Sequence, residues 1–130
     1  YREVQFYSHV IHLVSQVSGN LQSNKNTIRL VADTFPAGTL SGAPKHKAVE
    51  LINQYEKNQR SMYGGAIGYL GFNGDFNHAI IIRSFLSKNN ELFYQAGAGV
   101  VNQSNDESEK QEVFNKLAAL HKALNFAEEI

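Results

Sequence analysis

Two glutamates and a lysine near the carboxyl end of the sequence have a spacing that suits a metal site. Glu109, Glu112 and Lys116 are three and four residues apart, so at roughly 100° per residue they share one flank of a helix. Two carboxylates one turn apart can hold a hard cation, and Mg²⁺ suits them because it prefers oxygen ligands. The alternative is a solvated face with an ordinary Glu112–Lys116 ion pair.

Arg83 is a second residue that could take part in binding or catalysis, because it lies inside the mostly apolar run 79–86. A buried guanidinium is costly unless it meets an anion, and its planar fork matches a carboxylate. The alternative is an arginine at a sheet edge that reaches water or pairs with a structural aspartate. Sequence spacing leaves both interpretations open.

His12 lies in a segment where apolar and polar residues alternate. It is either a core histidine with a satisfied ring or a proton donor, since imidazole titrates near neutral pH. A metal pair of His9 and His12 is disfavoured, because alternation along a strand puts the two rings on opposite faces.

Two glycine-containing segments could bring backbone amides close to an anion. In the segment 38–45 only three residues separate the two glycines and Ala-Pro precedes the lysine, so the Walker pattern is not met and nucleotide binding is a poor inference. In the segment 95–99, Gly97 and Gly99 fit either tight strand packing or close approach of a carboxylate to the backbone.

The elements that must position these residues can be read from local patterns. Alternation predicts a strand over 6–17, and Asn26 is a cap for a short helix through Asp33 that must end before Pro36. Residues 37–44 read as a loop, and apolar residues at helical spacing predict a helix over 43–57 with Pro44 in its first turn.

The second half predicts three strands and a long helix. Strands are expected over 63–72, 79–86 and 92–101, joined by turns at 73–75 and 89–90 in the manner of a meander. Residues 104–107 read as a cap with an acidic first turn. The helix that follows has an apolar stripe, formed by Val113, Leu117, Leu120, Leu124 and Ala127.

Composition limits the class of protein. The 130 residues are 42% hydrophobic, with six tyrosines and eight phenylalanines, and twelve basic residues balance twelve acidic ones. One structural unit over 1–130 is therefore expected, with no broad positive field for nucleic acid and no run long enough to cross a membrane. The absence of cysteine fits a cytoplasmic enzyme. The start at Tyr1, without methionine, suggests a piece cut from a longer chain.

Several strings in the chain resemble the chorismate-utilising enzyme family, most closely its anthranilate-forming large subunits. The matching strings keep the family's order from Tyr7 onward, and FPAGTLSGAPK is highly specific. They are HLVS at 12–15, FPAGTLSGAPK at 35–45, YGGAIGYLG at 63–71, AIIIRS at 79–84, QAGAGVV at 95–101, and Glu109 and Glu112 with Lys116. The resemblance implies an α+β chain forming the carboxy-terminal part of a layered α/β/β/α fold with mostly antiparallel strands and packed helices.

The resemblance also implies a reaction. Ammonia, supplied from glutamine by an amidotransferase partner, adds to chorismate with loss of the ring hydroxyl, and pyruvate is eliminated to give anthranilate for tryptophan biosynthesis. In this scheme Glu109 and Glu112 would bind Mg²⁺, which grips the ring carboxylate near Lys116. Arg83 and Tyr63 would hold the enolpyruvyl carboxylate.

The remaining site residues follow from the same resemblance. Gly97 and Gly99 would offer backbone amides to the substrate, Thr39 would offer its hydroxyl, and His12 would assist departure of the ring hydroxyl. Another glutamate-bearing metal motif of the family lies upstream of the matching strings, so these residues alone are expected to be inactive. Sheet edges and apolar faces left uncovered would favour self-association.

Two other functions remain open at this point. The related large subunits that make aminodeoxychorismate, a folate precursor, share most of these motifs, although AGTLSG favours the anthranilate-forming ones. A non-catalytic domain could bind an acidic metabolite through Arg83, but simple binding does not require an acid–base group such as His12.

Overall fold

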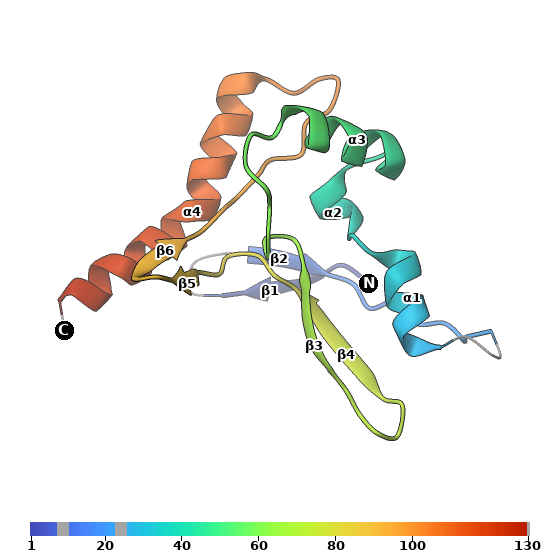
Figure 1. Cartoon of the computed structure of the whole chain (residues 1–130). Helices are drawn as coiled ribbons and strands as arrows, with labels where there is room; N and C mark the ends of the chain where they lie inside the picture. The colour runs from blue at the N-terminus through green and yellow to red at the C-terminus, as the bar shows by residue number, and fades with distance from the viewer. Residues whose placement is uncertain (8–10, 23–25, 130) are drawn as a thin grey trace.

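The computed structural model describes residues 1–7, 11–22 and 26–129 as four helices and six short strands. The strands pair only as antiparallel hairpins, giving three two-stranded sheets in the described part of the chain. This confirms an α+β chain with antiparallel strands. In Figure 1 the long helix α4 and the β3–β4 hairpin extend in different directions from a central region where the connecting segments meet.

The first hairpin joins β1 (Glu3–Phe6) to β2 (Ile11–Val14), with Glu3 opposite Val14 and Phe6 opposite Ile11. The prediction of one continuous strand over 6–17 was therefore wrong. Alternation is preserved on both sides of a chain reversal, so the pattern alone does not reveal the reversal. His9 lies outside the described residues, whereas His12 is in β2 and half-buried.

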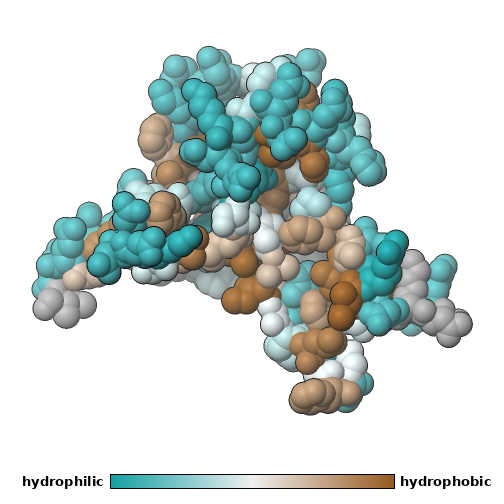
Figure 2. All heavy atoms as spheres, in the orientation of Figure 1, coloured by the Kyte–Doolittle hydropathy of each residue, from teal (hydrophilic) through white to brown (hydrophobic). Residues whose placement is uncertain are grey.

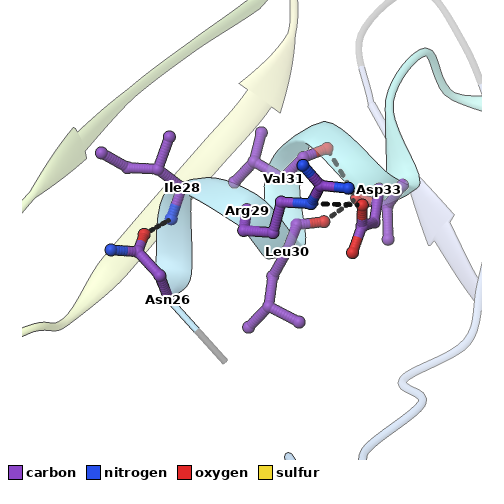
Figure 3. Close-up of polar contacts among 7 residues, drawn as sticks. Asn26, Ile28, Arg29, Leu30, Val31 and Asp33 are labelled. Atoms are coloured by element: carbon purple, nitrogen blue, oxygen red, sulfur yellow. Dashed lines mark hydrogen bonds and ion pairs between the residues drawn. The ribbon is translucent and has the colours of Figure 1, made fainter. Parts of the chain in front are cut away.

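Helix α1 (Thr27–Thr34) begins and ends where the sequence predicted. The Asn26 side chain accepts a hydrogen bond from the Ile28 amide at 2.8 Å, which satisfies one of the free donors of the first turn. Arg29 forms an exposed ion pair with Asp33 one turn later, at 3.1 Å (Figure 3). The helix ends just before Phe35 and Pro36.

The segment predicted as a loop over 37–44 contains one helical turn, α2 (Gly38–Ser41). Gly42 ends this turn with a φ of 86°, an angle that favours glycine. Helix α3 (Lys45–Tyr55) follows, with Pro44 as its N-cap and not in its first turn. Glycines stand at both ends of this segment, as is usual for a loop. The residues from Gly38 to Ser41 are nevertheless helical, because four residues suffice for a single turn.

The sequence predicted the first strand of the β3–β4 hairpin and its turn, but the second strand lies at Phe76–Ile80 and not over 79–86. β3 (Ala66–Leu70) pairs with β4 (Phe76–Ile80), and Gly74 has a φ of 90° in the connecting turn. Gly68 lies opposite His78, and a Cβ built on Gly68 would lie 2.2 Å from the Asn77 carbonyl oxygen. A glycine is thus required where the two backbones approach.

The next two strands differ from the expected meander. β5 (Leu86–Lys88) pairs with β6 (Glu91–Phe93) as a separate hairpin, with Asn89 and Asn90 both at positive φ in the turn. The run 79–86 is divided between β4 and β5, and most of the predicted strand 92–101 is irregular. Hydrophobic, β-branched residues indicated extended chain, but not the breaks between strands.

Helix α4 (Asp106–Glu128) is the longest element. Its N-cap is Asn105, whose side chain accepts from the Ser108 amide at 3.2 Å, and three acidic residues in the first turn favour the positive end of the helix dipole. The predicted apolar stripe faces inward over Val113, Leu117, Leu120 and Leu124, while Ala127 is exposed.

Very few side chains of the described residues are buried. Leu120, at 7% exposure, is the one buried hydrophobic side chain among them, and Ser41, at 6%, is the one buried polar residue. Figure 2 shows apolar side chains along the projecting β3–β4 hairpin, where Ile67, Tyr69 and Phe72 are exposed. Within the described part of the chain, every helix is too short or too polar to cross a lipid bilayer.

Candidate active site

Five of the residues singled out in the sequence line one pocket, which has a volume of about 170 Å³. Its walls come from α2, the segment before β3, the segment after β4, the irregular chain after β6, and one face of α4. The predicted site residues in these walls are Thr39, Tyr63, Arg83, Gly97 and Lys116. The fold therefore gathers them from five separate segments.

Tyr63 and Arg83 are brought together because the pairing of β3 and β4 continues past the ends of the strands. The Gly64 amide donates to the Ile81 carbonyl at 2.8 Å, and the Ile81 amide donates to the Gly65 carbonyl at 2.9 Å. These two hydrogen bonds hold the segments that carry the tyrosine and the arginine side by side.

Arg83 itself is exposed and lies between β4 and β5. Of the two interpretations left open by the sequence, burial inside an apolar strand is therefore wrong, and the arginine reaches the surface. Its φ of 52° is in the left-handed region, which interrupts the extended run. Such a conformation is costly for a residue with a Cβ and recurs at binding sites, where the surrounding structure holds it. Here it leaves Arg83 lining the pocket instead of filling a core.

His12 approaches the same arginine. Its Nε2 lies 3.4 Å from Nη1 of Arg83, and its ring centroid is 5.5 Å from that of Tyr7. His12 is not among the residues that line the pocket. The predicted acid–base residue is therefore placed next to a pocket residue and not within the wall itself.

Lys116 connects α4 to the glycine-rich segment. Its Nζ donates to the Gly97 carbonyl oxygen at 2.8 Å and lies 2.6 Å from Oε1 of Glu112. The ordinary Glu112–Lys116 pair considered from the sequence is thus present. Lys116 also lines the pocket, so the pair stands at the edge of the candidate site.

Glu109 is held differently from Glu112. Ser104 Oγ donates to Oε1 of Glu109 at 2.6 Å, and Ser104 Oγ accepts from the Val101 amide at 2.9 Å. The other oxygen, Oε2 of Glu109, is buried and has no hydrogen-bond partner among the described residues. A buried carboxylate oxygen without a partner is costly, so it marks a position where a further group is expected.

The donor set fits the magnesium ion that the resemblance implies. One carboxylate has an oriented oxygen and an unpaired buried oxygen, and a second carboxylate lies one turn along the helix. Magnesium is commonly held by one or two carboxylates while it keeps several waters. The described residues contain no group of three or more His, Asp or Glu side chains suited to a metal, so Glu109 and Glu112 would be a partial set of ligands.

Of the predicted residues not yet described in detail, Tyr63 and Thr39 line the pocket and Gly99 does not. Tyr63 Oη would be 3.5 Å from a Cβ built on Gly97, so the phenol lies against the glycine backbone. Thr39 is in α2 and exposed, and it lines the pocket. Gly99 is exposed and outside the pocket wall.

Two residues near the site were not proposed from the sequence. Ser104 was read only as part of a helix cap, although its hydroxyl orients Glu109. Arg60 was not singled out, yet it is half-buried and lines the pocket. Its spacing of four residues from Glu56 was the available signal, since such a pair often stabilises a turn.

A second, more open pocket of about 680 Å³ lies beside the first. Its walls are residues 58–63 and the β5–β6 hairpin with its flanking chain, and the two pockets share Arg60, Tyr63, Ile82 and Gln95. Of the predicted site residues only Tyr63 faces it. The smaller pocket therefore carries the candidate chemistry.

Comparison with known proteins shows the family to which the chain is similar. The profile of the family described as chorismate binding enzyme matches residues 1–122. The chain is 48% identical to anthranilate synthase component 1 from Neisseria meningitidis over 97% of its length, and 43% identical to that from Aquifex aeolicus over 99%. Each alignment covers 26% of the relative.

A solved structure gives the same result. The crystal structure of anthranilate synthase component I from Streptococcus pneumoniae TIGR4 matches with a TM-score of 0.83 and 44% identity, over 89% of this chain and 27% of that one. The chain thus spans about a quarter of the length of the relatives it matches. With the profile match extending over residues 1–122, the chain belongs to the chorismate binding enzyme family.

Proposed function

We propose that this chain forms part of the active site of an enzyme that converts chorismate and ammonia to anthranilate, pyruvate and water. The observation that carries the proposal is the pocket lined by Arg83, Tyr63 and Lys116, in a chain whose relatives are named anthranilate synthase component 1. Chorismate is a dianion, and Arg83 and Lys116 are two separate cationic residues of the pocket that could each pair with one carboxylate.

Arg83 is the proposed partner for the enolpyruvyl carboxylate, with Tyr63 beside it. Among the described residues, Arg83 has no ion pair with a carboxylate, so its fork is available for one from outside. Lys116 is the proposed neighbour of the ring carboxylate, because Glu112 and the Gly97 carbonyl already orient its ammonium. Two fixed contacts would hold the ring in a single orientation.

The proposed chemistry needs a proton for the departing ring hydroxyl. His12 is the candidate donor, because its imidazole lies beside Arg83 and histidine is the most common general acid in enzymes. Thr39, which lines the pocket from α2, would contribute a hydroxyl to the substrate, and Gly97 and Gly99 would contribute backbone amides. Glycine at these positions leaves the backbone accessible to a bound anion.

Glu109 and Glu112 are the proposed magnesium ligands. When bound, the ion would neutralise charge on the ring carboxylate of the substrate. Ser104 would hold one oxygen of Glu109 by a hydrogen bond and leave the other oxygen free for the ion. Groups that hydrogen-bond to metal ligands commonly orient them in this way.

The ammonia is proposed to come from a partner. The relatives are named as the first component of anthranilate synthase, and a second component that releases ammonia from glutamine fits that name. The expected cytoplasmic location remains a prediction from the absence of cysteine.

The test uses the full-length form of this protein with chorismate, ammonium and Mg²⁺. Equal amounts of fluorescent anthranilate and pyruvate are expected. An aminated product without pyruvate would instead support aminodeoxychorismate formation. Calorimetric binding of chorismate without any product would support a metabolite-binding domain, and neither binding nor turnover would overturn all three functions.

A further inference from the structure

Arg60 joins three parts of the chain that surround the candidate site. Its Nε and Nη2 donate to the two carboxylate oxygens of Glu56, at 2.8 and 2.5 Å. Its Nη1 donates to the carbonyl oxygen of Leu40, twenty residues earlier, at 2.8 Å. Its guanidinium carbon lies 5.7 Å from the centroid of the Tyr63 ring. One side chain thus contacts the end of α3, the turn α2 and the tyrosine of the pocket.

These contacts use properties that only arginine has. The fork binds a carboxylate with two parallel hydrogen bonds while a third N–H points elsewhere, and the flat face is attracted to an aromatic ring. A lysine ammonium could contact Glu56 or the Leu40 carbonyl but could not hold both with this geometry. Hydrogen bonding to Glu56 raises the pKa of Arg60, so the guanidinium is charged throughout the working pH range.

Arg60 and Arg83 differ in whether a carboxylate of the chain already pairs with the guanidinium. The charge of Arg60 is already matched by Glu56, which is one-third exposed, with Arg60 itself about one-quarter exposed. Arg83 has no carboxylate partner among the described residues. Arg83 is therefore suited to bind an anion, whereas Arg60 is suited to hold neighbouring groups in place.

Both groups next to Arg60 belong to the pocket. The Leu40 carbonyl follows Thr39 directly, and Thr39 lines the pocket from α2. Tyr63 also lines it, and its backbone amide donates to the Arg60 carbonyl at 2.8 Å. Fixing Leu40 and Tyr63 to one guanidinium fixes the separation of the threonine and tyrosine hydroxyls.

We propose that Arg60 is a positioning residue for chorismate, which sets the spacing between the Thr39 turn and the Tyr63 ring while its own charge is paired with Glu56. The proposal rests on the function proposed above. It predicts that Arg60 governs how well the substrate is bound, and that it acts through Tyr63.

The first test compares Arg60→Lys with Arg29→Lys in the full-length protein. Arg29 is the matched control, because it also pairs with an acid four residues away (Figure 3) but is largely exposed and does not line the pocket. Arg60→Lys is expected to raise the KM for chorismate about tenfold and to change kcat by less than about threefold. Arg29→Lys should leave both unchanged.

A merely structural role for Arg60 would give a different result. It would lower the thermal midpoint and the active fraction, so kcat would fall while KM stayed the same. That pattern, or equal effects of the two lysine variants, would overturn the proposal. Glu56→Gln keeps one acceptor for the guanidinium, so a smaller rise in KM is expected from it.

The second test is a double-mutant cycle with Tyr63→Phe. If Arg60 acts through Tyr63, the rise in KM for the double variant should be clearly less than the product of the two single effects. Simple multiplication of the two effects would show that the residues act independently and would contradict the proposal.

A third measurement separates failure of this inference from failure of the proposed function. In protein labelled with ¹³C-tyrosine, the Tyr63 ring signals should shift in Arg60→Lys and stay in place in Arg29→Lys, whether or not chorismate is turned over. Absence of anthranilate from the wild-type protein would refute the function alone. Unchanged Tyr63 signals in Arg60→Lys would refute the positioning role alone.

Discussion

Nη1 of Arg83 lies 3.4 Å from Nε2 of His12, which is 71 residues earlier in the chain. The contact is a hydrogen bond only when that imidazole nitrogen is unprotonated, with the proton on Nδ1. It joins the candidate anion-binding residue to the candidate proton donor. A carboxylate bound by Arg83 would compete with His12 for the same N–H groups, so binding of the substrate is expected to free Nε2 to take up from solvent the proton that it would then give to the departing hydroxyl.

Arg83→Ala should reduce kcat/KM for chorismate by about 10- to 100-fold in the full-length protein, since a hydrogen bond to a charged group contributes about 1.5–3 kcal/mol. Arg83→Lys should lose less, because it keeps the charge and loses the fork. Steady-state kinetics measure both. Normal kinetics in Arg83→Ala would remove this residue from the site.

Glu109→Gln should weaken Mg²⁺ binding by about tenfold or more, because it removes the charge from the carboxylate that has an unpaired buried oxygen. Calorimetric titration with Mg²⁺ in the presence of chorismate measures the effect without turnover. Glu107→Gln, an exposed change in the same first turn of α4, is the control. Equal affinities in the two variants would contradict the assignment of Glu109.

Ser104→Ala should weaken Mg²⁺ binding by about 10- to 100-fold, the usual range for groups that orient metal ligands. Its hydroxyl holds Oε1 of Glu109 at 2.6 Å, so its loss would let the carboxylate rotate. The same titration measures this change. Ser108→Ala removes a hydroxyl from the first turn without touching Glu109, and it should have little effect.

Ser61→Gly should stabilise the protein by about 0.5–1 kcal/mol. Ser61 has a φ of 50°, and the left-handed conformation costs a residue with a Cβ more than the extra chain entropy of glycine. The midpoint of urea unfolding should therefore rise. Asn89→Gly, at a φ of 55° in the β5–β6 turn, should change it little, because asparagine tolerates this region. A fall of the midpoint in Ser61→Gly would show that the serine side chain stabilises the segment.

The elements with local signals could be predicted, and those set by the rest of the chain could not. Asn26 marked the start of α1, and the acidic turn before the apolar stripe marked α4, because capping and amphipathicity act within a few residues. The β1–β2 reversal was missed because residues 7–10, Tyr-Ser-His-Val, contain no Gly, Pro, Asn or Asp. Propensity therefore gave no reason to break the strand.

In the candidate site, too, contacts between residues close in the sequence could be predicted, and contacts between distant segments could not. Glu112 and Lys116 could be paired from helical spacing alone, and the structure has that pair. The link from Arg60 to Leu40 and the contact of Arg83 with His12 join distant segments, so no spacing rule applies to them. The left-handed backbone of Arg83 was also invisible in the sequence, since glycine and asparagine are the usual markers of positive φ.

The 130-residue chain alone is expected to make no measurable anthranilate from ammonia and to self-associate. Apolar residues such as Phe6, Leu13 and Phe72 are exposed, and large uncovered apolar surfaces favour association. Sedimentation at increasing concentration should give a rising mean mass, and the fluorescence assay should stay at background. A monomer at all concentrations, or steady turnover, would contradict the corresponding expectation.

The three separate hairpins have a kinetic consequence. Each strand pairs with its immediate neighbour in the chain, so each hairpin requires closure of only one short loop and should form within about 1–10 μs. Contacts such as Arg60 with Leu40 and Arg83 with His12 require much longer loops to close. The pocket should therefore assemble last, in a slower phase than the one that builds the strands around it.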